Sequence, residues 1–169
     1  PYVLLNFQGD LDSVYTRAHE MGHAMHTYYS NANQPITYAE YLIFVAEVAS
    51  TCNEALLTQY LLNHTEDPGE RLYLLNHYLD SFRTTLYRQC MFAEFEHIAH
   101  TRQASGETLT QEVLDQIYGD LVKLYYGPDM VVDDEIVHEW MRIPHFYTSY
   151  YVDQYATGYS AAIAFSKRI

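Results

Sequence analysis

Apolar and polar residues follow a helical period over most of the chain, so the sequence predicts a mainly α-helical fold. Turn-forming residues divide this pattern, with "NANQP" and "NHTEDPGE" marking loops and Gly106 ending a long helical stretch. The first expected helix begins at Asp12 or Ser13, either of which can cap it, and ends at about residue 30. The next two cover about 38–62 and 70–102. A fourth runs from Thr108 or Thr110 to Lys123, and the last covers the final "SAAIAFSKRI".

Two segments depart from the helical period. Residues 1–7, "PYVLLNF", are β-branched and aromatic and end before Gly9, which predicts a short N-terminal strand. Residues 143–160, "IPHFYTSYYVDQYATGYS", are dense in tyrosine and break the period. No internal repeat or low-complexity linker divides the chain, so residues 1–169 are expected to form a single domain.

Composition narrows the choice of partners and compartment. The formal net charge is −13, which repels phosphate backbones and anionic lipid headgroups, so neither nucleic acid nor a membrane is expected as a partner. The apolar runs are shorter than a membrane span needs. Cys52 and Cys90 are too few for a disulfide framework, which favours the reducing cytoplasm. The chain begins without methionine and stops within an apolar run, so we expect it to be a piece of a longer protein.

The stretch "AHEMGHAMH" carries the clearest chemical signal. Residues four apart lie on one face of a helix, so His19 and His23 can bind one metal ion while Glu20 faces a water on that ion. A catalytic zinc site usually has three protein ligands, so a third is needed. A metzincin would have histidine at position 29, where this chain has Tyr29, and His26 is expected to be structural or to support a ligand.

A glutamate on the next helix is the expected third ligand. Glu40, Glu47 and Glu54 recur every seven residues and share one helix face, so periodicity alone does not choose among them. Glu47 lies within the apolar "YLIFVAEVAST", where a buried carboxylate needs a positive partner. Glu47 is therefore the predicted ligand, and Glu54 is predicted to accept a hydrogen bond that orients a ligating histidine.

With these residues in place, the chain resembles the oligoendopeptidase F family, a branch of the thimet-oligopeptidase-like zinc metallopeptidases. The matching segments are "NFQGDLDSVYTRAHEMGHAMHTYYS", "IFVAEVASTCNEALLTQYLL" and "RIPHFYTSYYVDQYATGYSAAIAFSK". In that family a glutamate about 28 residues after the first histidine completes the zinc site, and Glu47 stands at that distance from His19. The resemblance implies a zincin-type helical catalytic core, forming part of a larger and mostly helical peptidase.

The resemblance also implies an activity and further site residues. It implies a metalloendopeptidase with one Zn²⁺ per chain that hydrolyses short peptides, with Glu20 as general base and then acid. It implies that a histidine and tyrosines contact substrate or transition state, and these map to His145, Tyr150 or Tyr151, and Tyr155. It further suggests that "VLLNFQG" pairs with the peptide through main-chain hydrogen bonds.

Two alternatives stay open from sequence. Di-iron carboxylate bundles use Glu-x-x-His motifs, and this chain has three, Glu20–His23, Glu94–His97 and Glu135–His138. The second alternative is a piece that binds metal or peptide without activity. The physiological peptide, the cleavage preference, the tyrosine that stabilises the oxyanion and the oligomeric state are not determined by the sequence.

Overall fold

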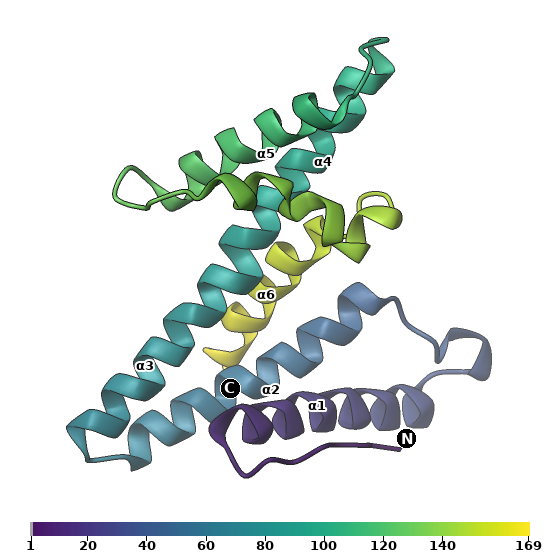
Figure 1. Ribbon diagram of the computed structural model, residues 1–169. Helices are drawn as coiled ribbons and strands as arrows, with labels where there is room; N and C mark the ends of the chain where they lie inside the picture. Colours follow the sequence, from purple (N-terminus) through teal and green to yellow (C-terminus); the bar gives the residue numbers. More distant parts are fainter. Residues whose placement is uncertain (1) are drawn as a thin grey trace. The chain divides into compact units, whose positions relative to one another are not determined.

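The structure, a computed structural model, describes residues 2–169, and this part of the chain contains helices and no strand. None of its helices is both long and apolar enough to cross a lipid bilayer. In chain order the elements are α1 (Leu11–Asn33), η1 (Ile36–Tyr38), α2 (Ile43–His64), α3 (Pro68–Phe82), the π-helical η2 (Arg83–Tyr87), α4 (Arg88–Ala104), α5 (Gln111–Tyr126), η3 (Asp134–Arg142), η4 (Pro144–Tyr147) and α6 (Asp153–Ser166) (Figure 1).

The described residues form two compact units. Residues 2–82 and 157–169 make up the first unit, which contains α1, α2, α3 and most of α6. Arg83–Ala156 make up the second unit, which contains η2, α4, α5, η3, η4 and the start of α6. Whether residues 1–169 act as one catalytic domain stays a prediction.

The mainly α-helical prediction is confirmed, but the N-terminal strand is wrong for the described residues. Residues 2–7 are extended and largely exposed, and the described residues form no strand beside them, whereas a strand requires a partner strand. Pro1 lies outside the described residues. The second helix also begins later than expected, because Pro35 is followed by the single turn η1 and α2 starts only at Ile43.

Helices α1 and α2 lie side by side and antiparallel in the first unit (Figure 1). Asp10 caps α1 by accepting a hydrogen bond from the Ser13 N–H at 2.9 Å, so the cap precedes the two residues expected from sequence. Along the interface, the Tyr15 hydroxyl bonds the Thr58 hydroxyl at 2.8 Å. Buried polar groups are thus paired across the helices rather than left without partners.

Gly22 lets the two helices approach closely. A Cβ placed on Gly22 would lie 2.7 Å from the Ser50 Cα and 3.0 Å from the Ala49 carbonyl oxygen. Both atoms belong to the α2 main chain, which cannot move aside as a flexible side chain can. Glycine at this position therefore sets the helix spacing at the point where His19 and His23 face α2.

The remaining helices of the first unit complete its core. In α6, Gly158 lies in ordinary contact with Phe44 and Val48 of α2, where an added Cβ would find its nearest atoms at 3.8 Å. The Tyr159 hydroxyl bonds the Ser81 hydroxyl of α3 at 2.7 Å. In the first unit, α6 thus packs against α2 and is bonded to α3.

The second unit has a larger apolar core with one buried carboxylate. Its core residues are Met91, Phe92, Phe95, Ile117, Tyr118, Leu121, Val122, Ile143 and Val152. Glu139 is 6% exposed and accepts hydrogen bonds from Arg88 and from the Tyr118 hydroxyl, both at 2.6 Å, and from Arg142. Burial opposes the charged form, but these bonds outweigh it and lower the Glu139 pKa.

Gly22→Ala is expected to lower the free energy of unfolding by about 1–3 kcal/mol, because the new methyl group overpacks the contact with the Ser50 main chain. Gly158→Ala is the matched control, since its methyl group has room and alanine favours a helix. Urea unfolding of both variants measures the difference. Equal stability of the two variants would contradict the role assigned to Gly22.

Candidate metal centre

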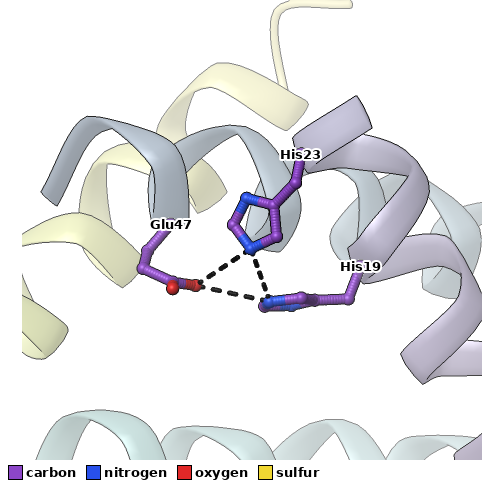
Figure 2. Close-up of side chains that lie close together, drawn as sticks. All are labelled: His19, His23 and Glu47. Atoms are coloured by element: carbon purple, nitrogen blue, oxygen red, sulfur yellow. Dashed lines mark hydrogen bonds and ion pairs between the residues drawn. The ribbon is translucent and has the colours of Figure 1, made fainter. Parts of the chain in front are cut away.

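Helices α1 and α2 bring three potential ligands together in the first unit. His19 and His23 are one helical turn apart on α1, and both side chains face α2. Glu47 comes from α2 and points toward both imidazoles (Figure 2). Among residues 2–169 this is the one group of three or more histidine, cysteine or acidic side chains whose ligand atoms converge, all within 4.8 Å of one another.

The spacing of the three donor atoms matches a tetrahedral ion. The Nε2 atoms of His19 and His23 are 3.1 Å apart, and the Glu47 Oε2 atom lies 3.3 Å from the first and 3.8 Å from the second. Zinc bonds of about 2.0–2.2 Å in a tetrahedron would separate ligand atoms by about 3.3–3.6 Å. Two imidazole nitrogens and one carboxylate oxygen are also ligands that zinc accepts, so the residues fit the metal.

Neighbouring side chains fix the orientation of two of these ligands. The Glu54 carboxylate, two turns beyond Glu47 on α2, bonds the Nδ1 atom of His19. The Ser50 hydroxyl donates to the Glu47 carboxylate at 3.2 Å. When the Nδ1–H group of a neutral His19 donates to the Glu54 carboxylate, the Nε2 lone pair faces the position between the three ligands, as metal sites require.

The electrostatics of the cluster favour a cation at this position. Burial lowers the pKa of His19, but hydrogen bonds and charge from Glu47 and Glu54 outweigh it and raise the pKa to about 10. The His19 hydrogen bond lowers the pKa of Glu47. Three lone pairs that face one another repel unless a positive charge lies between them, and that charge is either a proton or a metal ion.

Glu20 lies beside the ligands on α1 without a partner of its own. Its side chain is half-buried, and no described residue forms a hydrogen bond or ion pair with its carboxylate. A carboxylate in this state can accept a proton from a water molecule. The structure thus leaves Glu20 available for the acid–base role predicted from sequence, and that role stays a prediction.

Two sequence candidates lie outside the ligand cluster. Glu40 was expected within the helix over about 38–62, in its first turn, and this is wrong. It is exposed in the segment between η1 and α2, because α2 starts only at Ile43. His26 stacks on the Tyr41 ring with centroids 3.9 Å apart, and its buried Nδ1 atom has no hydrogen-bond partner among the described residues. His26 therefore packs α1 against the segment that precedes α2.

Three of the four other predicted site residues form one cluster in the second unit. The Tyr155 hydroxyl lies 3.3 Å from the His145 Nε2 atom, and the Tyr151 ring stacks near His145 with centroids 5.8 Å apart. Tyr150 instead contacts His100 of α4, with ring centroids 5.0 Å apart. The cluster belongs to a unit different from that of the ligands, so its part in a common site stays a prediction.

The second unit also holds a cavity of about 550 Å³. Its lining is largely apolar and includes Phe95, Leu114, Trp140 and Phe146. None of the four predicted residues of the second unit, His145, Tyr150, Tyr151 or Tyr155, lines it. The cavity is therefore separate from the His145 cluster, although both lie in the same unit.

The structure does not support the di-iron alternative. The side chains of Glu94 and His97 are exposed, and Glu94 accepts a hydrogen bond from the Tyr125 hydroxyl at 2.8 Å. His138 pairs with Asp115 at 3.0 Å instead of with a second glutamate–histidine motif. Side chains engaged in this way are not arranged as ligands of a shared iron pair.

Two residues that position the centre were not identified from sequence. The Asn53 side chain donates to the Ala18 carbonyl oxygen at 2.6 Å, which ties α2 to the turn of α1 that carries His19. Gly22 sets the helix spacing, and its signal in the sequence was a glycine inside an otherwise helical pattern. Asn53 carried no comparable signal, because asparagine on a helix surface is common.

Comparison with known proteins identifies the family. The model of peptidase family M3 matches residues 1–169. This chain belongs to peptidase family M3. The family recognised from the sequence motifs is thus confirmed, and the relatives of this M3 chain include proteins named for oligopeptidase activity.

Three of these relatives show the extent of the similarity. Oligopeptidase PepF of Bacillus subtilis is 57% identical over 169 residues, which are 100% of this chain and 25% of that protein. Chromosomal oligoendopeptidase F of Lactococcus lactis subsp. cremoris is 51% identical over 99% of this chain and 28% of that protein. The crystal structure of oligoendopeptidase-F from Enterococcus faecium aligns with a TM-score of 0.81 and 51% identity, covering 94% of this chain and 28% of that one. The M3 chain thus spans about a quarter of the length of these relatives.

Glu54→Gln is expected to weaken zinc binding about 10–100-fold, because the amide can donate to His19 and no longer fixes its tautomer. The matched control is Glu40→Gln, which removes one exposed negative charge outside the cluster. Competition with a chromogenic zinc chelator measures both affinities. Identical affinities for the two variants would show that the Glu54 bond does not support the metal.

Proposed function

We propose that this chain is the zinc-binding catalytic part of a metalloendopeptidase that hydrolyses peptide bonds in short peptides. The observation that carries the proposal is the convergence of the His19, His23 and Glu47 donor atoms at 3.1–3.8 Å. Membership of peptidase family M3 supports the peptidase reaction. The printed names of the relatives support oligopeptides as the substrate class.

In this proposal His19, His23 and Glu47 are the residues that would hold one Zn²⁺ ion. When bound, zinc lowers the pKa of a water molecule and polarises the scissile carbonyl group. Glu54 keeps the His19 ring in the ligating tautomer, and Ser50 holds the Glu47 carboxylate.

In this proposal Glu20 transfers a proton between the attacking water and the leaving amine. Its partner-free carboxylate takes a proton from the attacking water and delivers it to the leaving amine, which requires only that it stays next to the ligands on α1. The rigid helix keeps this spacing constant, since Glu20 follows His19 directly. The acid and base steps thus use one carboxylate.

The family resemblance assigns a histidine and tyrosines to contacts with substrate or transition state in this proposal. His145 and Tyr155 already lie within 3.3 Å of each other, and Tyr151 stacks beside them. Preplaced hydroxyl and imidazole donors stabilise negative charge on a carbonyl oxygen without reorganisation. By the family resemblance, His145, Tyr150, Tyr151 and Tyr155 are assigned to substrate and transition-state contacts.

The extended N-terminal segment fits main-chain binding of a peptide. Residues 3–7 are extended and largely exposed, and among the described residues only the Gln8 side chain bonds their main chain, at the Asn6 carbonyl oxygen. A peptide that adds alongside this segment would be bound through its main chain. Recognition of that kind tolerates many side chains, which suits an enzyme of loose sequence preference.

Glu20→Gln is expected to retain zinc and to lower kcat roughly 10²–10⁴-fold, because glutamine cannot accept the water proton. Asp12→Asn changes the same charge on α1 away from the ligands and serves as the control. Hydrolysis of a quenched fluorescent peptide gives kcat, and elemental analysis gives the zinc content. Retained turnover in Glu20→Gln would refute the acid–base assignment.

Glu47→Ala is expected to lose zinc, because one of three protein ligands is removed. Dialysis against zinc-buffered solution followed by elemental analysis compares this variant with Glu40→Ala, which leaves the cluster intact. Unchanged zinc content in Glu47→Ala would move the third ligand elsewhere.

A further inference from the structure

We infer that Glu96 of α4 is a positioning residue that fixes the tyrosine loop, defined here as Tyr147–Tyr151, and that it acts through Tyr150. The inference rests on the proposed function, in which this part of the chain contacts substrate. It is carried by five contacts and one backbone angle, all within the second unit.

Glu96 is a buried carboxylate aimed at the main chain of the loop. It is 3% exposed, and its Oε1 atom accepts a hydrogen bond from the Tyr150 N–H at 2.6 Å. A buried carboxylate requires such partners, and a bond to an ionised acceptor is shorter and stronger than a neutral one. The bond joins residues 54 positions apart in the chain, so it anchors the loop to a helix of the core.

Tyr150 has a backbone conformation that needs an anchor. Its φ angle is +54°, and it is the one non-glycine residue of the described chain with positive φ. A residue with a side chain persists in this region only when its surroundings hold it there. The Glu96 bond to the Tyr150 N–H acts directly on the main chain of the strained residue.

His100 contacts the side chain of Tyr150. It lies one turn beyond Glu96 on α4, and its ring contacts the Tyr150 ring edge-on with centroids 5.0 Å apart. Its Nε2 atom is 3.9 Å from the Glu96 Oε1 atom. One face of α4 therefore fixes both the main chain and the ring of Tyr150.

The backbone conformation of Tyr150 determines the direction in which the chain enters the cluster of His145, Tyr151 and Tyr155. Tyr151 follows Tyr150 directly, and its ring lies near both His145 and Tyr155, with centroids 5.8 and 5.7 Å apart. A change in the backbone at residue 150 would redirect Tyr151 away from these rings. Glu96 touches none of the three, so its effect on the reaction passes through the loop.

The first experiment measures the anchor without requiring turnover. Hydrogen exchange of the Tyr150 amide, followed by NMR on the chain of residues 1–169, compares wild type with Glu96→Ala and Glu96→Gln. Exchange at Tyr150 is expected to accelerate about tenfold or more in Glu96→Ala and less in Glu96→Gln, because the glutamine carbonyl still accepts the bond. Glu94→Ala is the matched control, since it removes a carboxylate and a tyrosine hydrogen bond from the same helix away from the loop.

The second experiment measures the effect on peptide hydrolysis. Glu96→Ala is expected to lower kcat/KM about 10–100-fold with unchanged zinc content, and Glu96→Gln is expected to recover part of it. In a Tyr150→Ala background the effect of Glu96→Ala is expected to shrink, because the group through which Glu96 acts is gone. If Glu96→Ala does not fold, Glu96→Gln replaces it with a smaller expected effect, because a neutral carbonyl accepts a weaker bond, and wild-type exchange at Tyr150 in that variant overturns the inference. His100→Ala tests the ring contact separately, since the His100 side chain is 44% exposed.

The outcomes separate this inference from the proposed function. Two results would overturn the inference and leave the peptidase proposal standing. One is an equal exchange rate of the Tyr150 amide in Glu96→Ala and Glu94→Ala. The other is an equal kcat/KM of these two variants in an active chain. A wild-type chain that binds zinc yet hydrolyses no peptide overturns the proposed function for this chain. In that case accelerated exchange at Tyr150 in Glu96→Ala still supports the anchor, and unchanged exchange overturns it.

Discussion

The close contact between Gly22 of α1 and the main chain at Ser50 of α2 is the constraint on which the metal centre depends. One helix can present His19 and His23 at the right spacing, but the third ligand must come from another element. Where the helices touch without an intervening Cβ, the Glu47 carboxylate lies 3.3 Å from one imidazole nitrogen and 3.8 Å from the other. Two bonds on one side of this contact, from Asn53 to the Ala18 carbonyl and between Tyr15 and Thr58, fix the helices in register.

The sequence predicted that His19, His23 and Glu47 lie together, because most of this arrangement is encoded by local spacing, and their role as metal ligands stays a prediction. His19, Glu20 and His23 are set by the helical period alone, and Glu47 was selected over Glu40 and Glu54 by its apolar surroundings together with the family resemblance. The apolar setting was only partly realised, since the Glu47 side chain is 33% exposed. The structure shows how the roles of the two glutamates differ, because Glu54 bonds the Nδ1 atom of His19 and Glu47 faces the Nε2 atom.

The sequence predicted less well wherever the outcome depends on tertiary contacts. The "PYVLLNF" segment has the composition of a strand, but a strand forms only with a partner, and the described residues supply none. The start of α2 was misplaced because the helical pattern extends back to about residue 38, whereas the chain after Pro35 forms a separate turn. The anchoring of Tyr150 by Glu96 joins residues far apart in the chain, and no local pattern predicts such a bond.

The measurement that tests the central claim most directly is zinc-edge X-ray absorption on the purified chain, together with its metal content. The account predicts one zinc per chain with a first shell of nitrogen and oxygen at about 2.0–2.1 Å and the outer-shell scattering of two imidazoles. A first shell that contains sulfur, a single imidazole, or iron in place of zinc would contradict the assignment of His19, His23 and Glu47 as the metal ligands.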